Sequence, residues 1–180
     1  MLNNNYSKGV IFSCIAAIFW GLPQPLFFNE LNHVKTIEVV AHRGFWSFIF
    51  LFLLLILISN LNEFIEIFKS RKRIFILTIT AFLIAGNWAG FIYSVGQERV
   101  QDASMGYFIT PMISIILGYF FLNEKITKPK LVSVCLMFSG ILFLFINLNQ
   151  FPFLIIWIGT SWAIYGLLRK QVNVNPSIGL

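Results

Sequence analysis

The chain contains six apolar runs, each close to the roughly 20 residues that a helix needs to cross the hydrocarbon core of a bilayer. They cover residues 9–28, 39–59, 74–96, 104–122, 131–148 and 151–168, and short polar segments separate them. Only 11% of the 180 residues are charged, against about 25% in soluble domains. The sequence therefore predicts an all-α integral membrane protein, folded as a bundle of six transmembrane helices.

The positions of the Lys and Arg residues predict how these helices are oriented. Ten of the thirteen lie on one side of the predicted bundle: Lys8, Lys69, Arg71, Lys72, Arg73, Lys125, Lys128, Lys130, Arg169 and Lys170. By the positive-inside rule this side is cytoplasmic, which predicts a multi-pass protein of the inner membrane with a cytoplasmic N-terminus. The net charge of +6 is then a consequence of topology. This excludes a nucleic-acid partner and leaves the lipid bilayer as the expected one.

The connection between the second and third runs has an amphipathic pattern. Leu61, Phe64, Ile65 and Phe68 follow the i, i+3, i+4, i+7 spacing of one helix face. We expect a short helix within residues 60–73 that lies on the inner leaflet, with the following basic residues near anionic headgroups.

The first run ends in an unusual stretch, "FWGLPQPLFF", at residues 19–28. Each proline removes a backbone donor, so Pro23 and Pro25 weaken the outer part of this helix. We expect a bend just beyond Trp20 and Gly21 that acts as a hinge for an outer gate. Trp20 is a candidate for solute contact beside that hinge.

The second run begins with His42 and Arg43, close to the predicted outer interface. Two interpretations stay open for this pair. Arg43 can extend to the headgroups while His42 makes a local hydrogen bond. Alternatively, both line the outer mouth of a pathway and meet an anionic or aromatic solute.

The third run carries small residues at intervals of four: Gly86, Gly90 and Ser94. This spacing allows two helices to approach closely. Asn87 lies on nearly the same stripe and needs a hydrogen-bond partner at membrane depth, either on another helix or on a solute. Trp88 and Tyr93 are further candidates for solute contact.

The fourth run has a continuous stripe of small and polar residues: Ser104, Tyr107, Pro111, Ser114 and Gly118. Pro111 removes the donor that would bind the Tyr107 carbonyl, which predicts a kink. The freed carbonyl needs a partner in the bilayer, and Thr110 and the Tyr107 hydroxyl are the nearest candidates. Tyr107 and Thr110 are therefore candidate solute contacts, whereas Ser114 and Gly118 are expected to pack against another helix.

Several of these stretches resemble one known family. "AHRGFWS", "GNWAGFIYSV", "ASMGYFITPMISIILGYFFLNEKIT" and "IGTSWAIYGLLRK" are similar, in this order, to RarD-type members of the EamA family in the drug/metabolite transporter superfamily. The resemblance implies an inner-membrane carrier of ten helices, built from two five-helix repeats of opposite topology.

An internal similarity predicts the same inverted repeat. "AIFWGL" at residues 17–22 matches "AIYGL" at 163–167, and the second stretch lies five spans after the first, an odd number that inverts it in the membrane. Residues 1–148 are expected to form the first repeat and residues 149–180 the incomplete start of the second. We therefore expect a C-terminally truncated chain that does not transport alone, and a second copy or a complementing chain as partner.

These features predict a secondary transporter that moves a small organic solute by alternating access. No GxxxxGK[ST] stretch is present, so the energy is expected from a gradient or from exchange. His42, Glu98, Asp102 and Glu124 are the candidates for proton coupling, the three carboxylates being alternatively solvated loop charges. The alternative function is a non-transporting membrane subunit or scaffold.

Enzymatic activity is not expected. The chain has two histidines and no acidic residue in the middle of a run, so it lacks a catalytic constellation. Cys14 and Cys135 lie in separate apolar runs, which predicts neither a disulfide nor a metal site. No cofactor and no metal are expected.

Overall fold

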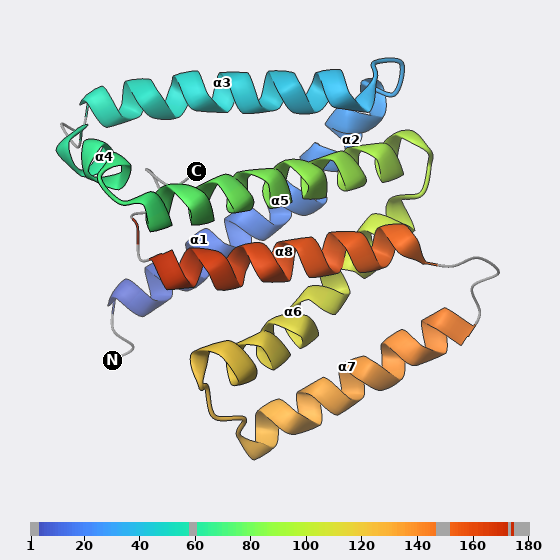
Figure 1. Ribbon diagram of the computed structural model, residues 1–180. Helices are drawn as coiled ribbons and strands as arrows, with labels where there is room; N and C mark the ends of the chain where they lie inside the picture. The colour runs from blue at the N-terminus through green and yellow to red at the C-terminus, as the bar shows by residue number, and fades with distance from the viewer. Residues whose placement is uncertain (1–3, 58–60, 147–151, 173, 175–180) are drawn as a thin grey trace.

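The computed structural model describes residues 4–57, 61–146, 152–172 and 174. This part of the chain forms eight α-helices (Figure 1): α1 (Asn4–Gly21), α2 (Pro23–Glu30), α3 (Thr36–Leu57), α4 (Leu61–Phe68), α5 (Arg71–Gly96), α6 (Val100–Leu122), α7 (Lys128–Ile146) and α8 (Phe153–Val172). The described residues form no strand. The predicted all-α class is confirmed.

Five segments of the described chain are long and apolar enough to cross a membrane: Ser7–Glu30, Thr36–Leu57, Arg71–Gly96, Val100–Leu122 and Lys128–Ile146. They coincide with the first five apolar runs and identify a multi-pass membrane protein. The sixth run lies mostly in α8, which is helical but is not among these five segments. Its stretch "GTSWAIYG" contains small and polar residues that lower the mean hydropathy. A sixth membrane span and the cytoplasmic N-terminus stay predictions.

The first membrane segment is divided into two helices. α1 ends at Gly21 and α2 begins at Pro23, so Leu22 lies between them. Pro23 occupies the first turn of α2, where its missing N–H group has no intrahelical partner to lose. The chain therefore changes helix at the stretch that contains both prolines.

α4 is the short helix that the amphipathic pattern predicts. Its buried Ile67 packs with Leu55 of α3, and Phe64 and Leu77 cover this small core. Ile65 and Phe68 are exposed, so part of the apolar face of α4 is open to the surroundings. Its place on the inner leaflet stays a prediction.

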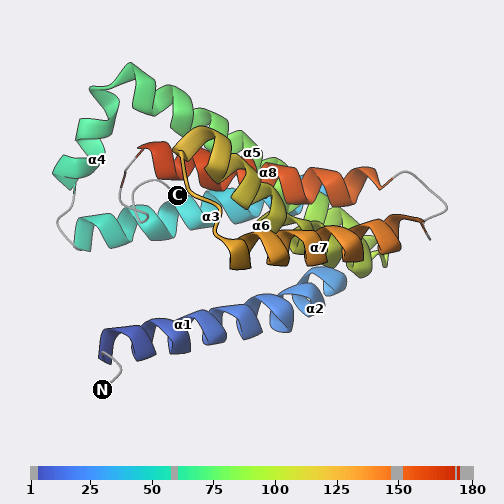
Figure 2. The same ribbon diagram turned by 90° about the horizontal axis from the view of Figure 1, so that it is seen from below.

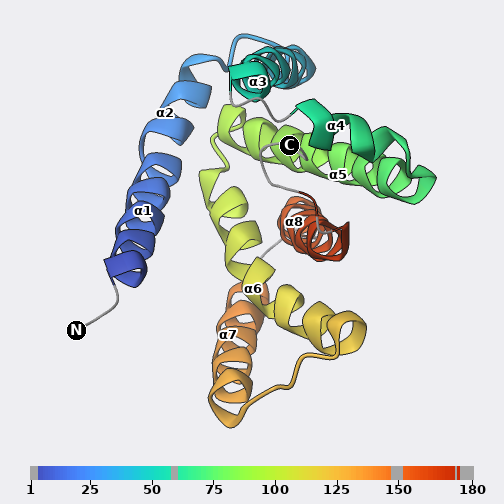
Figure 3. The same ribbon diagram turned by 90° about the vertical axis from the view of Figure 1, so that its left-hand side faces the viewer.

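α8 forms the centre of the bundle and packs between α5 and α6 (Figure 3). The contact with α5 is close at Gly86, where an added Cβ would lie 2.8 Å from a ring carbon of Trp157. The contact with α6 is equally close, because a Cβ on Gly106 would lie 2.7 Å from Cβ of Ile158. The missing Cβ atoms leave room for these α8 side chains, so α8 is the helix that packs against Gly86 and Gly90 of the stripe predicted on the third run.

α1 and α2 lie to one side of the other helices (Figure 2). The described side chains of α1 beyond Ser7 are all exposed. In α2, Phe28 is buried and reaches the main core, where it meets Phe91 of α5. The first membrane segment therefore joins the bundle mainly through its α2 end.

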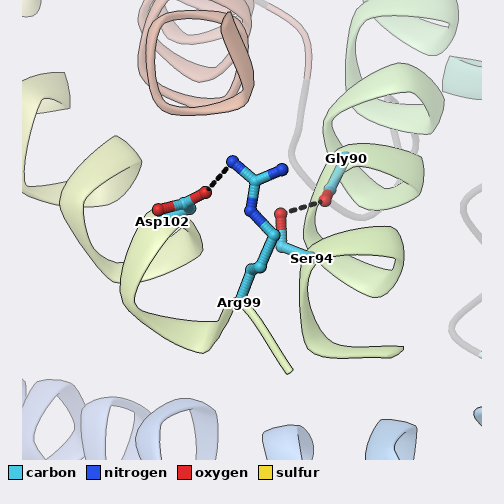
Figure 4. A network of polar contacts seen from close by, with 4 residues as sticks. All are labelled: Gly90, Ser94, Arg99 and Asp102. Carbon is cyan, nitrogen blue, oxygen red and sulfur yellow. Dashed lines mark hydrogen bonds and ion pairs between the residues drawn. The ribbon is translucent and has the colours of Figure 1, made fainter. Parts of the chain in front are cut away.

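A tight turn joins α5 to α6, and Glu98 adopts a positive φ of 57° within it. Arg99 pairs with Asp102 in the first turn of α6, and the Ser94 hydroxyl donates to the Gly90 carbonyl within α5 (Figure 4). Both side-chain contacts stay at one helix end each, whereas the backbone bond from Arg99 N to the Ser94 carbonyl, at 2.8 Å, crosses the turn from α6 to α5.

Candidate functional site

A cavity of about 850 Å³ lies against α1, α2 and α3. Its aromatic lining comes from Phe19, Trp20, Phe27, Phe28 and Trp46. Its polar lining comes from Gln24, His42, Arg43 and Ser47. The cavity therefore contains three of the predicted contact residues, Trp20, His42 and Arg43, and its wall includes Pro23 of the helix break.

Arg43 is the half-buried cation of this cavity. Its guanidinium carbon lies 4.0 Å from the ring centroid of Trp88 and 5.6 Å from that of Phe28, both within cation–π range. With the Gln24 amide oxygen facing Arg43, the two terminal guanidinium nitrogens donate to it at 3.1 and 3.3 Å. Gln24 and the two rings thus hold the guanidinium at the cavity wall.

Trp20 connects the cavity to the centre of the bundle. Its ring centroid lies 5.9 Å from that of Tyr107 on α6 and 5.8 Å from that of Trp162 on α8. Tyr107 and Trp162 are themselves 6.0 Å apart in an edge-to-face arrangement. The three rings form an aromatic cluster that joins α1, α6 and α8.

Asn87 continues this connection as a hydrogen-bonded network. The Tyr107 hydroxyl donates to Asn87 Oδ1 at 2.9 Å. Asn87 Nδ2 donates to the Ile158 carbonyl at 2.8 Å and to Ser161 Oγ at 3.0 Å. Asn87 is fully buried, so its amide joins α5, α6 and α8 away from the surface. The partners predicted for it on other helices are therefore present, and solute contact by Asn87 stays a prediction.

Residues 7–146 match the EamA-like transporter family. The chain belongs to this family. An "Uncharacterized transporter" of Vibrio cholerae is 33% identical over 173 residues, which are 96% of this chain and 57% of that protein. "Protein RarD" of Escherichia coli K12 is 32% identical, with 96% and 58% covered, and "Uncharacterized transporter YojE" of Bacillus subtilis is 31% identical, with 96% and 59% covered. No solved structure matches the chain.

This EamA-like chain spans under two thirds of the length of these curated relatives. The match confirms the resemblance to RarD-type transporters and a multi-pass membrane protein. The relatives are named as transporters or as RarD. The predicted boundary between the two repeats, at residues 148 and 149, stays a prediction.

The remaining candidates for solute contact in the EamA-like chain lie outside the described lining of the cavity. Thr110 donates to the Gly106 carbonyl at 3.3 Å and to the Gly159 carbonyl of α8 at 3.4 Å, so it contributes to helix packing. The Trp88 ring packs against the Arg43 guanidinium. Tyr93 is 45% exposed and lies outside the described lining, so solute contact by Tyr93 stays a prediction.

Pro111 lies inside α6, which continues as one helix to Leu122 and bends along its length (Figure 3). Ser114 and Gly118 lie farther along α6 and line a second cavity of about 330 Å³ beside α8. A Cβ on Gly118 would meet the Glu124 side chain at 3.2 Å, so a loop residue covers this glycine.

Glu124 forms an ion pair with Lys170 at the wall of the second cavity. The hydrogen bond and positive charge of Lys170 lower the pKa of the Glu124 carboxyl. The pair joins the loop after α6 to the last turn of α8. Glu124 and Asp102, two candidates for proton coupling, therefore both have basic partners, while Glu98 is exposed.

Sequence reasoning missed the contribution of α8. Ser161 and Trp162 belong to the site network, although neither was expected to contact Asn87 or Trp20. The small and polar stretch "GTSW" at 159–162 within an apolar run could have indicated a buried face.

Proposed function

We propose that this chain is part of a secondary transporter of the inner membrane that moves a small organic solute by alternating access, and is not an enzyme. The cavity against α1, α2 and α3 is the proposed solute-binding site. Its volume of about 850 Å³ falls within the roughly 300–1,000 Å³ of small-molecule sites. The main support for this proposal is that one cavity combines aromatic walls with a few polar side chains.

The helix break at Leu22 supports a moving gate. Trp20 lies just before the break and contacts both Tyr107 and Trp162. Pro23 begins α2 and lines the cavity. We propose that α2 rotates about this break, which changes the contacts of Trp20 and opens the cavity. A few residues at helix ends commonly absorb such hinge motion.

The partner we propose is a second copy or a complementing chain that supplies the remaining helices. The chain covers 57–59% of the length of the relatives described above. α7 and α1 present exposed apolar side chains, Leu136 and Phe143 on α7 and Phe12 and Ile15 on α1. These faces fit either lipid or further transmembrane helices.

The test measures exchange of ¹⁴C-labelled metabolites across proteoliposomes that contain the chain alone or together with the C-terminal remainder of the E. coli relative. We expect exchange above that of empty liposomes in the reconstituted pair. Tyr107→Phe removes the hydroxyl that donates to Asn87 Oδ1 and should slow exchange. Tyr119→Phe is the matched control, because Tyr119 is exposed on the same helix. If neither preparation shows exchange, the scaffold alternative is favoured.

A further inference from the structure

The charge of Arg43 has no counter-charge in the cavity. No Asp or Glu belongs to the lining that the structure describes. The ion pairs of the described residues join Arg99 to Asp102 and Lys170 to Glu124, and neither involves Arg43. A half-buried cation in an apolar setting is costly unless a partner compensates it. An anionic group that enters the cavity would therefore be attracted to Arg43, whose charge no side chain of the described lining neutralises.

The geometry around Arg43 leaves part of its donor set available. Trp88 and Phe28 lie within cation–π range of the guanidinium carbon. Gln24 accepts one hydrogen bond from each terminal nitrogen. The remaining N–H groups have no partner among the described residues. A planar guanidinium matches the paired oxygens of a carboxylate or a phosphate better than any neutral group.

The rest of the lining describes the other part of the ligand. Trp20, Phe27 and Trp46 present exposed aromatic surface to the cavity. We propose that the solute is a small organic anion, with its carboxylate or phosphate on Arg43 and an apolar or aromatic body against these rings. This proposal rests on the proposed function, because it assigns a substrate class to the same cavity.

The first test compares three probes of the same shape and different charge. The full chain in phosphatidylcholine nanodiscs is dialysed against radiolabelled indole-3-acetate, indole-3-acetamide or tryptamine. We expect the anion to bind about tenfold or more tighter than the neutral amide, as a charged hydrogen-bonded pair supplies. Tryptamine should bind weakest. Equal binding of the three probes, tightest binding of tryptamine, or binding of none of them overturns the inference.

The second test removes the charge. Arg43→Gln should reduce binding of indole-3-acetate by about tenfold or more, to the level of the amide, and should reduce amide binding far less. Arg71→Gln is the matched control, since Arg71 is exposed at the start of α5. Equal loss of both probes, or an unchanged anion preference, overturns the proposal. Helicity by circular dichroism checks that Arg43→Gln folds, and if it does not, the three-probe comparison on the unmodified chain decides.

A lipid headgroup offers the same anionic chemistry, so a third test replaces part of the lipid with phosphatidylglycerol. Anion preference in phosphatidylcholine alone supports a solute. The opposite outcome is that the anion preference is absent, and that the unmodified chain but not Arg43→Gln retains a phosphatidylglycerol molecule. Arg43 then binds lipid, and the proposal of an anionic solute is overturned. A further outcome is that anion and amide bind equally and that Trp20→Ala abolishes the binding of both. This outcome overturns the anionic class of the solute but leaves the cavity as the solute site. Unaltered exchange in Tyr107→Phe would instead count against the proposed function.

Discussion

Replacing Asn87 with alanine tests whether this amide holds the bundle together. The substitution removes the three hydrogen bonds that Asn87 makes to Tyr107, Ile158 and Ser161. Interhelical hydrogen bonds in membrane proteins average about 0.6 kcal/mol each, so their loss amounts to about 2 kcal/mol. The emptied side-chain volume adds to this, because Asn87 is fully buried.

The assay is reversible unfolding of the chain in mixed micelles of dodecyl maltoside and SDS, followed by circular dichroism. We expect Asn87→Ala to reduce the free energy of unfolding by about 2–3 kcal/mol. Ser104→Ala is the control, because the exposed Ser104 hydroxyl donates only within its own helix. That variant should unfold almost as the unmodified chain does.

A double-mutant cycle separates the Tyr107 bond from the rest. Tyr107→Phe in the unmodified chain should cost about 0.6 kcal/mol, and it should cost less when Asn87 is already alanine. A loss below about 0.5 kcal/mol for Asn87→Ala, or full additivity of the two substitutions, would refute this role of the Asn87 amide.

Three further predictions concern packing, charge and the helix break. Gly106→Ala should destabilise by about 1–3 kcal/mol through overpacking, whereas Gly140→Ala, which meets nothing within 4 Å, should not, and the same unfolding assay compares them. Because pairing with Lys170 lowers the pKa of the Glu124 carboxyl, its contribution to stability is present above the unfolded-state pKa and is lost as pH falls through the folded-state pKa. Thermal unfolding between pH 3 and 7 should therefore show an acidic loss that Glu124→Gln reduces, and equal pH profiles would contradict this. Replacing Pro23 and Pro25 together by leucine should join α1 to α2, because both missing backbone donors return. This double variant should slow metabolite exchange more than it lowers stability, measured on one preparation, and a larger effect on stability would argue against a hinge.

The hydrophobic pattern was sufficient to predict five of the six expected membrane helices, because length and apolar composition alone decide whether a helix can span a bilayer. The local chemistry of proline likewise predicted where the first segment divides, at Leu22. For Asn87, the high cost of an unpaired amide predicted that a partner exists. These inferences depend on a residue and its near neighbours in the sequence.

The identity of the partners could not be predicted in the same way. Asn87 bonds to Ser161, which is 74 residues away, and Trp20 meets Trp162 on α8. A stripe of small residues indicates that some helix packs closely, but it does not say which one. The central position of α8, and with it the place of Trp162 in the aromatic cluster, follows from tertiary packing alone.

Alternating access requires that the cavity beside Arg43 opens in turn to each side of the membrane. The most direct measurement places a cysteine at Ser47, a half-buried residue of the lining, in a chain with Cys14 and Cys135 replaced by alanine. A membrane-impermeant maleimide is applied to right-side-out and to inverted vesicles that contain the chain with its complementing partner. We expect labelling of Ser47→Cys from both sides, reduced from each side by indole-3-acetate. Labelling from one side alone, with no change on addition of the probe, would contradict alternating access.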